Sequence, residues 1–144
     1  MDVVKRYQRG FTLIEVMVVV VILGILAAFI VPKIIGRPDE AKVAKVRSDV
    51  QALQTAMDLY RLDNGRYPTT EQGLRALVER PTSEPVPTGW RTGGYIQKLN
   101  DDPWGRQYLY LNPGEHGEID IFSYGAEGKA GGEGINTTIG NWSN

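Results

Sequence analysis

The chain has 144 residues, with 16 Lys and Arg against 17 Asp and Glu, and it contains no cysteine. This length allows one small domain, and a net charge of −1 offers no basic surface for nucleic acid. The lack of cysteine excludes disulfides, thiolate metal sites and thiol catalysis. Any long loop must therefore be held by packing, by hydrogen bonds or by a metal ion.

A short basic segment precedes a long apolar one at the N-terminus. Residues 1–10 carry three basic side chains, whereas residues 11–31 carry one ionisable side chain, Glu15. As a helix, residues 11–31 would be about 30 Å long, which is enough to cross a bilayer. The basic residues would stay in the cytoplasm, so the C-terminal part would be exported. We predict a membrane-inserted helix; a cleaved secretory signal is the alternative, although its apolar core is usually shorter.

The junction Gly10-Phe11-Thr12-Leu13-Ile14-Glu15 resembles the processing signal of type IV pilins and pseudopilins. The resemblance implies cleavage after Gly10 by a prepilin peptidase in the membrane, followed by N-methylation of Phe11. A carboxylate at membrane depth costs about 2.5–3.5 kcal/mol on insertion scales, so Glu15 needs a functional explanation. We predict that Glu15 pairs with the new N-terminal amine of Phe11 in a neighbouring subunit.

Two prolines, Pro32 and Pro38, follow the apolar run. Proline inside a helix removes a backbone hydrogen bond and clashes with the preceding turn, so a kink or break is expected near Gly24–Pro32. In pilin-like proteins this stretch of helix melts during assembly, and the resemblance implies the same here. A bent anchor that never changes is the alternative.

Apolar residues after Pro38 follow helical spacing. They recur at steps of three and four residues: Val43, Val46, Val50, Leu53, Met57 and Tyr60. This stripe predicts an amphipathic helix with one face on a core. Asp63-Asn64-Gly65 predicts its end. One helix is therefore expected from the apolar segment to about residue 64.

The remaining residues predict a small cap on this helix, and thus an α+β fold with a small antiparallel sheet. Thr69 and Gln72 fit a capping box that would open a short helix through Val78. Residues 107–111 and 118–122 are strand candidates, with a turn between them. Four aromatic residues are expected to anchor the core and turns: Trp90, Tyr95, Trp104 and Tyr108.

Further motifs extend the resemblance along nearly the whole chain, to the major pseudopilins of the type II secretion system. They are residues 62–74, Gly94-Tyr95-Ile96, residues 102–105, residues 120–125 and Ile139-Gly140-Asn141-Trp142. Type IV pilus subunits usually close their C-terminal region with a disulfide, which this chain cannot form. The predicted parts are a leader (1–10), a transmembrane and assembly helix (11–36) and a periplasmic domain (37–144).

The resemblance implies a structural subunit of a periplasmic helical fibre that grows from the inner membrane. Growth of that fibre would help to push folded exoproteins through the outer membrane. The implied partners are other copies of the chain, minor pseudopilins, the prepilin peptidase that also N-methylates, an inner-membrane assembly platform, and the lipid bilayer before assembly.

The resemblance also implies a calcium site in the terminal loop, where residues 125–134 contain five glycines. Carried over by position, the ligands are the carbonyls near Tyr124 and Lys129, the Glu127 carboxylate, and Thr137 or Thr138. The family usually has Asp at position 127 and at one or both of the Thr positions. Calcium prefers six to eight oxygens, several from carboxylates, so the predicted site is weakened. A loop without metal is the alternative.

No arrangement typical of an enzyme is present in the sequence. The one histidine, His116, lies in a predicted turn, and Asp101-Asp102 is typical of turn chemistry. The Gly-rich residues 131–134 do not join a strand to a helix, so they do not predict a phosphate site. We expect a protein that is not an enzyme. The alternatives within its class and beyond are a type IV pilus subunit and a membrane-anchored periplasmic binding domain.

Overall fold

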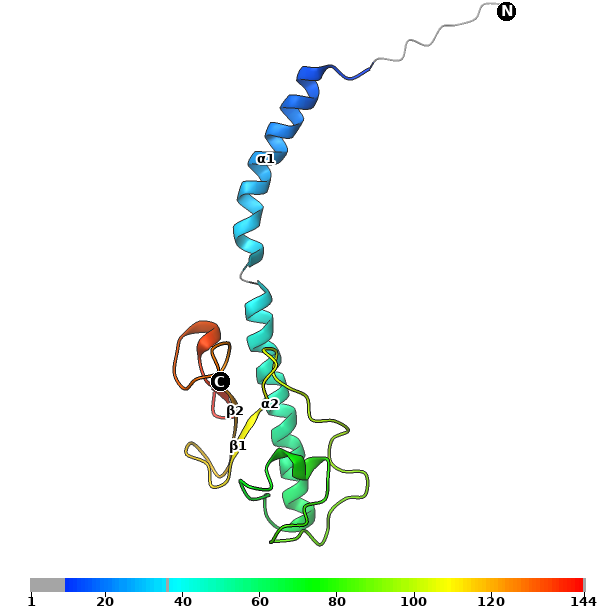
Figure 1. Ribbon diagram of the computed structural model, residues 1–144, viewed down its shortest axis with the longest axis vertical. Coiled ribbons are helices and arrows are strands. Elements are labelled where there is room, and N and C mark those ends of the chain that lie inside the picture. Colours follow the sequence, from blue (N-terminus) through cyan, green and yellow to red (C-terminus); the bar gives the residue numbers. More distant parts are fainter. Residues whose placement is uncertain (1–9, 36, 144) are drawn as a thin grey trace, which may run out of the picture. The chain divides into compact units, whose positions relative to one another are not determined.

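The computed structural model describes residues 10–35 and 37–143, drawn in colour in Figure 1. The chain divides into two units, Met1–Pro38 and Asp39–Asn144. The predicted leader, apart from its last residue, lies outside the described residues. The predicted boundary after residue 36 stays a prediction, although the division between the units falls close to it.

The first helix, α1 (Leu13–Ile35), is dominated by Val, Ile and Leu. Thr12 precedes its first residue, and the carbonyl and hydroxyl oxygens of Thr12 accept the N–H of Glu15 at 3.1 and 3.3 Å. Every large apolar side chain described in this helix is at least 50% exposed. In the described parts of the chain, no helix has both the length and the apolar character needed to cross a membrane. The predicted span therefore stays a prediction.

Of the kink or break expected near Gly24–Pro32, the break is not found, because α1 is helical through both residues, and the kink stays a prediction. A proline deletes a single backbone donor, and an apolar helix can continue around it. The expectation of one helix up to residue 64 stays a prediction, because α1 ends at Ile35 and α2 begins at Arg37, on either side of residue 36, which lies outside the described residues.

The second helix, α2 (Arg37–Asn64), carries the predicted apolar stripe. Five of the six residues in this stripe are buried, namely Val46, Val50, Leu53, Met57 and Tyr60. The sixth, Val43, is partly buried and packs against the same cluster. The helix ends as predicted: Gly65 has a φ of 76°, and its N–H donates to the carbonyl of Arg61 at 2.7 Å. The amphipathic helix and its end are confirmed.

The capping box is confirmed, but the helix after it is shorter than predicted. The backbone N–H of Gln72 donates to the Thr69 hydroxyl at 3.2 Å, and the N–H of Thr69 donates to Gln72 Oε1 at 3.1 Å. Gly73 then adopts a φ of 59°, which interrupts helical geometry. Only a four-residue 3₁₀ helix, η1 (Leu74–Leu77), follows, and it does not reach Val78.

A three-stranded antiparallel sheet lies beside α2 (Figure 1). Its strands are β1 (Leu109–Leu111), β2 (Asp120–Ser123) and β3 (Ile139–Gly140), in that order. The first two lie within or close to the predicted segments, whereas β3 is too short to give a periodic signal. Tyr110 pairs with Ile121 in the sheet. The α+β fold is confirmed.

The aromatic residues predicted as anchors join this core. Tyr108 is buried in it, and Trp90, Tyr95 and Trp104 are partly buried against it. The indole Nε1–H of Trp90 donates to the carbonyl of Ala76 at 2.8 Å. The packing role predicted for these residues is confirmed.

Candidate functional site

The predicted processing site lies just before α1. Gly10, Phe11, Thr12 and Glu15 line an open hollow of about 470 Å³. Gly10 and Phe11 have no regular secondary structure, and the Phe11 side chain is 83% exposed. Open space surrounds the position that a side chain on Gly10 would take. Packing within the described chain therefore gives no reason for glycine at this position.

Glu15 lies in the first turn of α1, one turn after Phe11. The unpaired N–H groups of a helix N-terminus favour a negative charge at this position. Thr12 already accepts the Glu15 N–H through its hydroxyl, so the backbone of this turn is fixed. Cleavage after Gly10 would create an amine close in sequence to this carboxylate. The side chain of Pro32, the other predicted assembly residue, lies outside the described residues.

The terminal loop is tied together by its own polar groups. The Asn136 amide donates to Glu127 Oε1 at 2.9 Å, and the Ala126 N–H donates to the carbonyl of Ile135 at 2.8 Å. The N–H of Gly131 donates to the hydroxyl of Thr138 at 3.4 Å. The two halves of the loop are therefore connected, and the predicted ligand Glu127 already has a hydrogen-bond partner.

The donor set fits calcium poorly. Glu127 is the only carboxylate among the predicted ligands, beside Tyr124, Lys129 and Thr137. Among the described residues, no group of three or more His, Asp or Glu could hold a metal ion. The guanidinium of Arg106 also contacts the two residues that precede Glu127. A fixed positive charge there opposes a divalent cation. Calcium binding stays a prediction.

A cluster that the sequence analysis missed joins the β1–β2 turn to the C-terminus. The buried Asp120 carboxylate accepts the N–H of Glu115 at 2.8 Å and of His116 at 3.1 Å. It also contacts His116 Nδ1 at 2.9 Å, and the imidazole stacks on Trp142. Burial raises the pKa of Asp120, but the hydrogen bonds from His116 and Glu115 outweigh it, so the pKa lies below its usual value. The sequence signal that could have indicated this contact is the spacing of four residues between His116 and Asp120.

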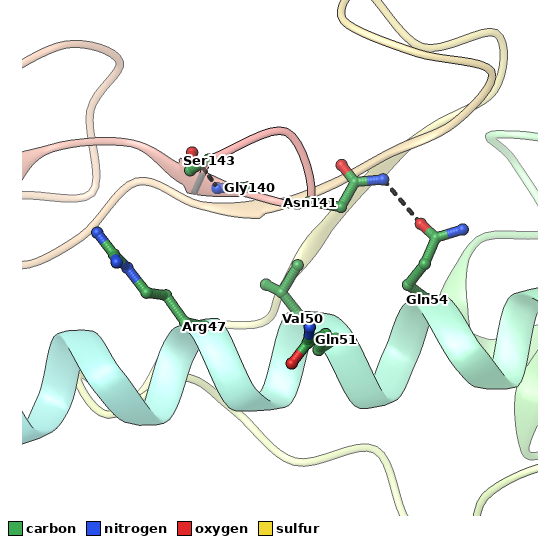
Figure 2. Close-up of a pocket in the computed structure, with 7 residues that line it drawn as sticks. All are labelled: Arg47, Val50, Gln51, Gln54, Gly140, Asn141 and Ser143. Atoms are coloured by element: carbon green, nitrogen blue, oxygen red, sulfur yellow. Dashed lines mark hydrogen bonds between the residues drawn. The ribbon is translucent and has the colours of Figure 1, made fainter.

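A groove of about 460 Å³ separates α2 from the C-terminal segment. Figure 2 shows its lining, in which Arg47 is the only charged residue. Asn141 crosses it and donates to Gln54 Oε1 at 2.7 Å. Among the described residues that line this groove there is no carboxylate or histidine, so these residues offer no pair of acid and base. Its polar contacts hold the C-terminal segment on α2.

Two family models match the chain in adjacent parts. The prokaryotic N-terminal methylation motif matches residues 5–31, which include the predicted cleavage site. The model for type II secretion system protein G matches residues 33–142, which include α2, the sheet and the terminal loop. The two matches together cover nearly the whole chain.

Relatives of known name share more than half of their residues with the chain. Type II secretion system core protein G of Pseudomonas aeruginosa is 55% identical, over 97% of this chain and 99% of that protein. The protein of the same name from Vibrio cholerae is 57% identical, over 95% and 93%. A crystal structure of the major pseudopilin from the type 2 secretion system of enterohaemorrhagic Escherichia coli matches with a TM-score of 0.67 and 54% identity, over 75% of this chain and 92% of that one. The chain therefore belongs to the protein G family of the type II secretion system, the family of its major pseudopilin.

Proposed function

We propose that this chain is the principal building block of a periplasmic helical fibre, the pseudopilus, which helps to drive folded exoproteins through the outer membrane. The observation that carries the proposal is that the N-terminal methylation motif (residues 5–31) is followed directly in the sequence by the part that matches type II secretion system protein G (residues 33–142). The motif contains the site for cleavage and the apolar helix. The domain that follows it would present a surface on which other subunits can pack. Both are needed for a subunit that is stored in a membrane and then stacked.

The exposed apolar side chains of α1 require a cover. Lipid provides it before assembly, so we propose a single-pass subunit of the inner membrane with its C-terminal domain in the periplasm. Neighbouring α1 helices provide the cover in the fibre. Because lipid tails are about as apolar as leucine, this exchange brings little hydrophobic gain. A polar contact must therefore favour the fibre over the bilayer.

Glu15 is the group in α1 that is suited to that contact. Alone among lipid tails its carboxylate would cost about 2.5–3.5 kcal/mol, and an amine partner offsets that cost. We propose the Phe11 amine of the neighbouring copy as this partner. N-methylation of that amine leaves it protonated, so the ion pair is kept. The prepilin peptidase is thus needed to create one half of the contact.

The proposed role is mechanical and not enzymatic. The groove beside α2 has no acid–base pair, and the one histidine is held between Asp120 and Trp142. The further proposed partners are minor pseudopilins and an inner-membrane assembly platform, with no part for nucleic acid. A type IV pilus subunit would instead form a surface fibre, and an anchored binding domain would form none.

The test is genetic replacement in the bacterium that carries the chain. Deletion is expected to abolish secretion of a folded exoprotein into the medium, and the wild-type copy to restore it. Overproduction is expected to give fibres that can be sheared off, with this chain as their main component by mass spectrometry. Normal secretion after deletion, together with no fibres on overproduction, would contradict the proposal.

A further inference from the structure

Arg106 binds the start of the terminal loop with both ends of its guanidinium. Its Nη1–H donates to the carbonyl of Gly125 at 2.9 Å, and its Nη2–H donates to the carbonyl of Ala126 at 3.0 Å. A guanidinium presents its donors in a fixed planar fork, so two adjacent carbonyls are held in one orientation. The loop is thereby attached to a residue 19 positions earlier in the chain.

Gly128 allows this close approach. Its φ is 68°, and a side chain there would place Cβ 2.6 Å from Nε and 2.7 Å from Cζ of Arg106. The positive φ favours glycine at this position, and a side chain there would have to displace the guanidinium. The glycine at this position is explained by the arginine rather than by flexibility of the loop.

A hydrogen-bond network around the buried side chains of Asp102 and Ser123 fixes the backbone of Arg106. Asp102 Oδ1 accepts the N–H of Trp104 at 3.0 Å and of Arg106 at 2.9 Å, so the backbone of this turn is set. Asp102 Oδ2 accepts the Ser123 hydroxyl at 2.6 Å, and the Ser123 Oγ accepts the Gly125 N–H at 3.1 Å. The same carboxylate thus positions the arginine and the strand end from which the loop begins.

We propose that Arg106 is the cation that organises the terminal loop of this chain, and that the loop folds without calcium. The guanidinium donates hydrogen bonds to two carbonyl oxygens at the start of the loop and so fixes the backbone there. Asn136 satisfies the one predicted carboxylate ligand, Glu127. The proposal concerns only this loop and holds whether or not the chain forms a secretion fibre.

The experiment measures thermal unfolding of the full mature chain in detergent, in 5 mM calcium chloride or in a chelator, by tryptophan fluorescence. For the wild type we expect the same melting temperature in both. Arg106→Gln is expected to lower it by roughly 5 °C in both, because two hydrogen bonds from a charged group are lost. The melting temperature of Arg106→Lys is expected to lie between those of the wild type and Arg106→Gln, because an ammonium keeps the charge but lacks the planar fork.

Trypsin provides a second readout, because Lys129 lies within the loop. Cleavage after Lys129 is expected to be slow in the wild type with or without calcium, and several-fold faster in Arg106→Gln. Arg75→Gln is the matched control: Arg75 is an exposed arginine that pairs with Glu79 on the surface. It is expected to leave both readouts unchanged.

Three results would overturn the proposal. The first is a wild-type melting temperature that rises by several degrees with calcium, and the second is cleavage after Lys129 that only chelation accelerates. The third is an Arg106→Gln variant as stable and protease-resistant as the wild type. A calcium response that appears only in Arg106→Gln would support the proposal, since calcium would then act on the loop only where the guanidinium no longer binds it. If Arg106→Gln does not fold, the wild-type titration still decides.

Discussion

The imidazole of His116 stacks on the indole of Trp142, with ring centroids 3.8 Å apart and planes 5° from parallel. The two residues come from the β1–β2 turn and from the segment after β3. Asp120 binds the imidazole through its Nδ1. The C-terminus is therefore fastened to the sheet by a side-chain contact and not only by the two-residue strand β3.

Acid is expected to weaken the domain through Asp120. An Asp in an unfolded chain has a pKa of about 3.9, and the hydrogen bonds around Asp120 lower its pKa in the folded state. The folded state therefore binds this proton less readily. The contribution to stability is complete above about pH 4 and is lost as the pH falls through the folded pKa.

The measurement is the melting temperature of the full chain between pH 7 and pH 3. Asp120→Asn is expected to lose about 1–3 kcal/mol at pH 7, because buried donors lose a charged acceptor, and to show a smaller further loss in acid. Asp101→Asn, which changes an exposed acid that is not among the hydrogen-bond partners of Asp120, is expected to behave as the wild type. Parallel pH curves for Asp120→Asn and the wild type would contradict this account.

Replacing His116 should separate its two contacts. His116→Ala removes both the stack and the bond to Asp120, and we expect a loss of about 1–2 kcal/mol in the free energy of unfolding. His116→Phe keeps a ring over Trp142 but cannot bind Asp120, so about half of that loss is expected. Urea unfolding gives both values. Equal losses in the two variants would assign the whole effect to the hydrogen bond.

Local patterns in the sequence were enough to predict most of the fold. The apolar stripe of α2 and the capping box of Thr69 and Gln72 depend on residues three or four positions apart, so short-range spacing reveals them. The strands β1 and β2 alternate or run apolar over a few residues and were found for the same reason. The break expected near Gly24–Pro32 was wrong because a proline removes only one backbone donor, and the apolar helix continues through it.

Contacts between distant residues could not be predicted in this way. Arg106 reaches Gly125 across 19 positions, and Asn141 reaches Gln54 across 87. Their side chains are of common types, and the residues next to them in the sequence form no pattern that indicates a distant partner. The resemblance predicted a metal for the terminal loop, whereas the contacts of Arg106 became visible only in the folded chain.

Glu15→Ala should separate membrane storage from assembly. Removing a carboxylate from an apolar helix lowers its cost in lipid, so the amount of chain in the membrane fraction should be unchanged or higher. Fibres and secretion should fall by at least tenfold, because the contact that favours the fibre over lipid is lost. Sheared fibres and exoprotein in the medium are measured by immunoblot.

Two controls sharpen this test. Glu71→Ala removes an exposed glutamate from the cap and should leave both readouts normal. Glu15→Asp keeps the charge on a shorter side chain and should retain part of the fibre yield. Wild-type fibre yield in Glu15→Ala would remove the ion pair from the mechanism.

Gly10→Val should block processing without disturbing the fold. Open space surrounds Gly10 and the residue lies before α1, so an added side chain meets nothing in the described chain. A β-branched side chain should nevertheless hinder a peptidase that must approach the backbone next to the bond it cuts. Mass spectrometry of the membrane fraction should find the precursor, with no N-methylated Phe11.

Gly24→Ala is the matched control for this test. Gly24 also has open space around it but lies within α1, so this variant should be processed normally. Mature chain in normal amount from Gly10→Val would place the cleavage at another bond, and the amine of Phe11 would then no longer be available to Glu15.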